Sequence, residues 1–165
     1  MSFKFVNRIL SSCLLFLSLS NANAAVNVSH MKTYVLRLSP GDDPKVKLQA
    51  FVNENNLKAA VVLSAVGSLT KAVLRYANSD NPTTLTGHFE IVSLSGTLGS
   101  TSGSHLHLSV SDNTGKTLGG HLMDGSVIFT TLEISIGAMT DLEFKREVDP
   151  VTTYKELKVY PLNSK

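Results

Sequence analysis

Cysteine and net charge are both scarce in this chain of 165 residues, and each absence excludes a class of function. Cys13 is the only cysteine, so no disulfide can form within the chain. The 15 basic and 13 acidic residues give a formal charge of only +2. A chain this close to neutrality lacks the broad positive field that attracts nucleic acid. No basic run or aromatic platform compensates for it.

The first 24 residues are predicted to be a secretory signal peptide. Lys4 and Arg8 precede an apolar run over residues 9–19, and Ala22-Asn23-Ala24 supplies an A-x-A cleavage site. The apolar run is shorter than the roughly 20 residues that a transmembrane helix needs. We therefore expect cleavage near Ala24, a periplasmic or secreted protein, and no transmembrane segment in the mature chain.

Cleavage would leave 141 of the 165 residues, enough for one domain with its own core. We place this domain at residues 32–162, after a short disordered lead-in over residues 25–31. Cleavage would also remove Cys13, and with it the only thiol, and would lower the formal charge from +2 to 0. Histidine and carboxylate groups would then be the only side chains available to a transition metal.

Residues 103–125 contain three of the five histidines and are predicted to form a β-hairpin. Asp112 and Lys116 close a three-residue loop, in which Gly115 adopts the left-handed conformation that ends a type I turn plus bulge. A two-residue loop would shift the register by one step and move every side chain to the opposite face. The prediction therefore depends on Gly115 ending the turn.

In this register the three histidines project from one face. His107 lies opposite His121 and His105 lies opposite Met123, and residues two apart on a strand share a face. Three neutral nitrogen ligands with an open fourth position are typical of a catalytic zinc site. A cluster of polar histidines on a half-exposed strand is the alternative, and their number favours metal binding. The opposite face is predicted to supply core residues, namely Leu106, Leu108, Val110, Leu118 and Leu122.

Two carboxylates are candidates for proton transfer. Glu90 shares a predicted strand face with Val92 and Leu94, and a carboxylate on an apolar face needs a partner or a raised pKa. Glu90 could therefore act as an acid or base, or support a metal ligand; exposure at the end of the strand is the alternative. Glu133, on the strand predicted over residues 127–136, is the second candidate, with the same possible roles and the same alternative of simple exposure.

The remaining patterns predict an α+β fold, a twisted and largely antiparallel sheet, like an open barrel, with one principal helix. Asp42-Asp43-Pro44 begins the helix, and Leu48, Phe51 and Val52 form its apolar stripe. We expect residues 59–65 to be a strand buried on both faces and residues 67–70 to be a turn. The other predicted strands are residues 32–38, 72–76, 88–98, 142–148 and 154–161. The charged side chains of residues 142–148 are interpreted as an ordinary solvated face. Residues 77–86 should form an exposed loop without chemistry.

Four segments in this order resemble the plants-and-prokaryotes-conserved domain, usually called the PPC domain. They are Ser39-Pro40-Gly41, AAVVLSAVGSL from Ala59, FEIVSLSGTLG from Phe89, and Gly103-Ser104-His105-Leu106-His107 with Leu118-Gly119-Gly120-His121. The resemblance covers about residues 31–139 and implies a homotrimer. It also implies a metal, zinc in the first place, on His105, His107 and His121. The family's fold is similar to that of acetolactate decarboxylase, where three histidines hold zinc.

The resemblance leaves two functions open. One is a metal-dependent lyase or hydrolase that acts on a small molecule at the metal, by analogy of fold. The other is a non-catalytic trimeric module for binding or assembly. Plant members join the domain to AT-hooks and act on chromatin, but this chain contains no AT-hook, so we do not expect nucleic-acid binding.

Overall fold

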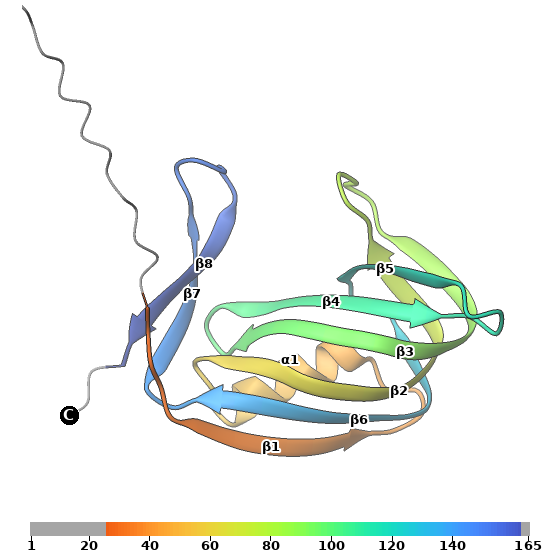
Figure 1. The fold of residues 1–165 in the computed structure, drawn as a ribbon, viewed down its shortest axis with the longest axis horizontal. Helices are drawn as coiled ribbons and strands as arrows, with labels where there is room; N and C mark the ends of the chain where they lie inside the picture. Colours follow the sequence, from red (N-terminus) through yellow and green to blue (C-terminus); the bar gives the residue numbers. More distant parts are fainter. Residues whose placement is uncertain (1–25, 163–165) are drawn as a thin grey trace, which may run out of the picture.

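The computed structural model describes residues 26–162, and within them the chain forms one helix and eight strands (Figure 1). The elements are β1 (Met31–Leu38), α1 (Pro44–Glu54), β2 (Ala60–Arg75), β3 (Thr83–Gly99), β4 (Gly103–Ser111), β5 (Thr117–Leu122), β6 (Val127–Met139), β7 (Leu142–Val148) and β8 (Lys155–Pro161). The predicted signal peptide lies outside the described residues. Within those residues no helix has the length and apolar character needed to cross a membrane. The α+β prediction is confirmed.

Six strands form one twisted antiparallel sheet in the order β1-β6-β2-β3-β4-β5. The sheet curls, because the end of β2 also pairs with β5 through Leu74–Leu122 and Arg75–His121. This second pairing draws the sheet together at one end without closing a regular barrel. β7 and β8 form a separate two-stranded hairpin that rises away from the sheet (Figure 1).

Helix α1 begins and packs as the sequence predicts. Asp43 is the N-cap, and its Oδ1 accepts hydrogen bonds from the backbone N–H groups of Lys45 at 2.9 Å and Val46 at 3.3 Å. Leu48 and Val52 are fully buried against the sheet. The Oδ2 atom of Asp43 accepts from the N–H of Gly125 at 2.5 Å. Asp43 therefore joins the start of the helix to the loop that follows β5.

Strand β2 corrects two predictions. It runs unbroken from Ala60 to Arg75, so the predicted turn at residues 67–70 is wrong. Three shifts in its register with β6 bend the strand instead, and a β-carbon on Gly67 would collide with the backbone of β6. Burial on both faces is also wrong, because Leu63 is 49% and Val66 is 63% exposed. The outward face of β2 is therefore exposed over residues 63–66, whereas residues 67–69 and 72–74 are buried on both faces.

Two further predictions are wrong at the ends of elements, and β1 begins one residue earlier than predicted. Residues 83–86 belong to β3, so the loop before it is shorter than expected. Leu118 is 36% exposed near the tip of the hairpin rather than buried in the core. Met31 begins β1, and in the predicted disordered lead-in the backbone N–H of His30 donates to the Asp141 carboxylate at 2.7 Å.

An apolar patch lies on the side of the sheet that faces away from the core, where β1, β6 and β2 run together. The patch consists of five apolar side chains, which are between 41% and 78% exposed. Near the centre of these strands, Glu133 of β6 lies between Arg37 of β1 and Val66 of β2. We use the name apolar patch for Met31, Val35, Leu63, Val66 and Phe129.

Candidate metal centre

The β4–β5 hairpin has the predicted turn. The N–H of Asp112 donates to the carbonyl of Lys116 at 3.0 Å, and Gly115 donates back to Asp112 at 3.0 Å. Gly115 has φ of +80°, in the left-handed region that glycine adopts without strain. His107 therefore lies opposite His121 as predicted.

The predicted pairing of His105 with Met123 does not form. Strand β5 ends at Leu122, which pairs with β2, and the N–H of Met123 donates to the carbonyl of Val73 at 2.9 Å. The sequence of the hairpin carries no sign of this exchange of partners, because β2 lies far away in the chain. His105 still projects on the same face as His107, since both alternate with buried residues of β4.

Two glycines allow β5 to approach both of its neighbours. A β-carbon on Gly119 would lie 2.7 Å from Oγ of Ser109, and one on Gly120 would lie 2.7 Å from the carbonyl oxygen of Arg75. Real β-carbons essentially never come this close, so a side chain at position 120 would push β5 away from β2, and one at position 119 would displace the Ser109 hydroxyl. The Gly-Gly pair before His121 thus sets the position of that histidine.

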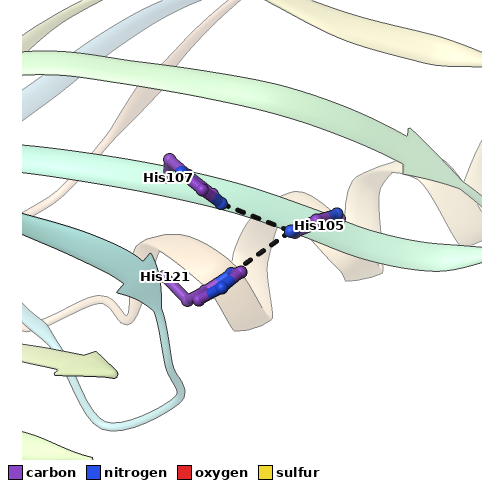
Figure 2. Close-up of side chains that lie close together, drawn as sticks. All are labelled: His105, His107 and His121. Carbon is purple, nitrogen blue, oxygen red and sulfur yellow. Dashed lines mark hydrogen bonds between the residues drawn. The ribbon is translucent and has the colours of Figure 1, made fainter. Parts of the chain in front are cut away.

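The three imidazoles converge in the structure, as Figure 2 shows. Nε2 of His105 lies 3.2 Å from Nδ1 of His121 and 3.3 Å from Nε2 of His107. The three nitrogen atoms all lie within 4.8 Å of one another. This cluster joins two neighbouring strands, and it could hold a metal ion.

The contacts within the cluster fit a metal better than a set of hydrogen bonds. A nitrogen of neutral imidazole carries either one proton or one lone pair, so Nε2 of His105 cannot make a well-aligned hydrogen bond to both of its neighbours. A tetrahedral ion with bonds of 2.0–2.1 Å holds its ligand nitrogens roughly 3.3 Å apart. The two short separations match this value. An ion would use all three lone pairs at once.

The surroundings of the cluster favour neutral imidazoles. Burial lowers the pKa of His105 below its usual value, and the positive charge of Arg146 lowers it further. Burial is also the largest cause of the lowered pKa of His121, followed by the charge of Arg75. Only a deprotonated nitrogen can bind a metal, so a lowered pKa leaves these ligands available at neutral pH.

A cleft of about 670 Å³ opens beside His105 and His121. A second hollow of about 420 Å³ shares Ser104, His105 and Lys155 with it. The β7–β8 hairpin supplies the Lys155 and Glu156 side of the cleft, and the loop before β3 supplies another side. The remaining residues of the cleft are Lys45, Arg75, Asn78, Ser79, Asp80, Leu106, Leu122, Met123 and Tyr154.

Two segments that looked unimportant in the sequence border this site. Asn78, Ser79 and Asp80 come from the loop in which we expected no chemistry. Arg146 comes from the strand that we interpreted as an ordinary solvated face, and it lines the second hollow with His105. Their sequence signal is weak, because only the folding of distant elements onto the hairpin brings them to the histidines.

The structure does not bring Glu90 or Glu133 into the cleft. Glu90 is exposed and lies opposite Ser111, four residues along β4 from His107, or about 13 Å. The predicted face shared with Leu94 is wrong, because a register shift between residues 91 and 93 leaves Leu94 buried and Glu90 exposed. Glu133 is exposed beside the apolar patch. Within one chain, neither carboxylate lines the cleft, and their catalytic role stays a prediction.

Comparison with known proteins gives a consistent family. The model of the Plants and Prokaryotes Conserved (PCC) domain matches residues 26–140. The chain is 45% identical over 132 residues to "Bifunctional protein GlmU" of Synechococcus sp. (strain JA-2-3B'a(2-13)), which covers 80% of this chain and 21% of that protein. The chain therefore spans about a fifth of the length of that relative.

Two solved structures share the fold. A hypothetical protein from Salmonella cholerae-suis has a TM-score of 0.80 and 47% identity, over 82% of this chain and 97% of that one. A metal-containing protein from Archaeoglobus fulgidus has a TM-score of 0.67 and 26% identity, over 79% of this chain and 98% of that one. Both are matched along almost their whole length, so the fold is shared as a complete domain.

Proposed function

The chain belongs to the Plants and Prokaryotes Conserved (PCC) domain family, and from this premise we propose that it binds one divalent metal ion, zinc, through His105, His107 and His121. The observation that carries the proposal is the convergence of three imidazole nitrogens within 4.8 Å on adjacent strands. The relative from Archaeoglobus fulgidus, described as metal-containing, supports it. Zinc suits the site because three neutral nitrogens with no thiolate are a common zinc ligand set.

The cleft beside the histidines favours action on a small molecule. Its volume of about 670 Å³ lies within the range of small-molecule sites, about 300–1,000 Å³. A bound zinc ion would supply a Lewis acid and a water molecule of lowered pKa. The chain would hold the ion with its histidines and would admit the ligand past Arg75 and Lys155. A lyase or hydrolase that acts on a small molecule fits this arrangement.

A non-catalytic homotrimer is the second candidate function. The apolar patch favours it, because exposed apolar surface on one face of a sheet is typical of a contact surface. In that case the metal would only stabilise the fold. His107→Ala would then lower the thermal stability without loss of any chemical activity.

Nucleic-acid binding is disfavoured, and export is part of the proposal. Cleavage of residues 1–24 would leave a neutral chain in the periplasm or outside the cell, away from the chromosome. A salt titration tests the first point: an association with duplex DNA that weakens steeply as salt rises would contradict it. Sequencing the amino terminus of protein recovered from the periplasm tests the second, and a start near Ala25 is expected.

Elemental analysis tests the metal site. Protein purified without chelator should contain about one zinc ion per chain. His88→Ala is the control, because His88 packs against Phe129 with the ring centroids 4.3 Å apart and the ring planes tilted by 38°, and it takes no part in the cluster. Absence of stoichiometric metal from both the unmodified chain and this variant would refute the proposal.

A further inference from the structure

Arg75 lies beside His121 because of the sheet. It is the last residue of β2 and pairs with His121 of β5. Its side chain borders the cleft together with His105 and His121. One nitrogen, Nη1, donates to the carbonyl of Ser79 at 3.2 Å, which holds the guanidinium toward the loop side of the cleft.

Arg146 lies beside His105 in a similar way. It comes from β7, and its Nη2 donates to Oγ1 of Thr97 at 2.8 Å. Thr97 of β3 is the residue that pairs with His105 of β4. Arg146 of the β7–β8 hairpin thus places a second guanidinium beside His105, in the hollow that also contains Lys155.

The cleft and its neighbouring hollow are rich in cations that lack a carboxylate partner. Four cations, two of which are these arginines, line the two spaces, against the two carboxylates Asp80 and Glu156. Lys45 pairs with Asp124 at 2.6 Å. Among residues 26–162, no ion pair involves Arg75, Arg146 or Lys155. Each guanidinium carries five N–H donors, and each makes one hydrogen bond in this part of the chain.

This local excess of positive charge contrasts with the neutral charge expected of the mature chain. Placing like charges together beside metal ligands opposes the binding of a cation at that point. An anion that occupies the cleft would remove this cost, and the planar guanidinium group pairs with two oxygens of a carboxylate or phosphate at once. The arrangement is therefore suited to a negatively charged ligand.

We propose that a small oxyanion, the carboxylate or phosphate group of a small molecule, binds where the cleft meets the neighbouring hollow, between Arg75 of the cleft and Arg146 of the hollow and next to the histidines. Lys155, which lines both spaces, adds a third positive charge to the same group. This inference deepens the proposed function by naming the class of its ligand. The size of the cleft limits the ligand to a small molecule rather than a nucleic-acid duplex.

The test is an NMR titration of the metal-free chain with malonate and, separately, with inorganic phosphate. Arg75→Met and Arg146→Met should each weaken the binding of the preferred anion by at least about tenfold. Arg37→Met is the matched control, because Arg37 also donates to a threonine hydroxyl, Oγ1 of Thr131 at 3.1 Å, but lies beside the apolar patch. It should bind like the unmodified chain.

A conservative variant guards against loss of the fold. Arg75→Lys keeps the charge but not the two-pronged geometry, so it should bind with intermediate affinity and should melt like the unmodified chain. A stronger response to malonate would identify a carboxylate ligand, and a stronger response to phosphate would identify a phosphate ligand. Failure of the unmodified chain to bind either anion, or equal binding by Arg75→Met, Arg146→Met and Arg37→Met, would overturn the inference.

Metal content measured on the same variants separates the two proposals. Arg75→Met should still take up metal, because the arginine is not a ligand and its removal lowers the local positive charge. Binding of the anion without any metal uptake would refute the proposed metal site and leave this inference standing. Uptake of metal, together with equal anion binding by Arg75→Met, Arg146→Met and Arg37→Met, would support the metal site and refute this inference.

Discussion

The histidine cluster and the apolar patch lie on the same side of one sheet, and they differ only in which residues alternate with the core. On β4, buried leucines alternate with His105 and His107. On β6, buried isoleucines alternate with outward residues, among them Phe129 and Glu133. Both regions are at least partly exposed to solvent in a single chain. The same alternation thus presents a cluster that could hold a metal ion where the outward residues are histidines, and an exposed apolar patch where they are apolar.

The largest effect is expected at the histidine cluster. His107→Ala removes one of three ligands, so the affinity for zinc should fall more than about 100-fold, beyond the 10–100-fold typical of residues that only support a ligand. His88→Ala, beside the apolar patch, should bind zinc like the unmodified chain. Competition with a chromogenic chelator measures both. An equal loss in the two variants would remove the distinction between the two regions.

The second effect concerns the apolar patch. Val66→Asp places a carboxylate opposite Glu133 in the centre of the patch, so the proposed homotrimer should dissociate. Val151→Asp is the matched control, because Val151 is 87% exposed in the β7–β8 turn. Light scattering should give the mass of a single chain for the first variant and of three chains for the second. If both variants keep the mass of the unmodified protein, the patch is not the contact surface.

Two glycines sharpen the comparison in terms of stability. Gly120→Ala directs its new carbon at the backbone of Arg75, which cannot yield, so it should destabilise the chain by about 1–3 kcal/mol and weaken metal binding. Gly137→Ala directs its carbon at the flexible ends of Met31 and Leu63 in the apolar patch. Gly137→Ala should leave the metal affinity unchanged, and it should lower the free energy of unfolding by less than Gly120→Ala does. Equal melting temperatures would show that β5 does not depend on its close approach to β2.

The smallest effect is the pH dependence of the metal-free chain. The pKa of His105 and that of His121 are lowered in the folded state, mainly by burial, relative to the unfolded value of about 6.5. The unfolded chain therefore binds more protons, so stability should be full above about pH 6.5 and should fall as the pH drops through the lowered folded values. Thermal melts between about pH 7 and pH 5 measure this slope. The double variant His105→Asn, His121→Asn should flatten it; an unchanged slope would contradict the assignment.

Local chemistry explains which parts of the structure the sequence predicts. The hairpin register follows from Gly115, whose conformation depends only on its own turn, and the helix follows from Asp43 and Pro44. The bend of β2 does not follow in this way, because its register shifts depend on pairing with β6, more than 50 residues away. Arg75 and Arg146 were missed for the same reason. The position of each arginine beside the histidines follows only from the curl of the sheet and from the β7–β8 hairpin, neither of which its own strand predicts.

The most direct test of the account is a crystal structure of the metal-loaded protein with anomalous scattering recorded at the zinc edge. We predict one anomalous peak per chain, about 2.0–2.1 Å from one nitrogen of each of His105, His107 and His121. The fourth ligand should be water or an anion in the cleft beside Arg75. No peak between the three histidines, or a fourth ligand supplied by a protein side chain, would contradict an open metal site.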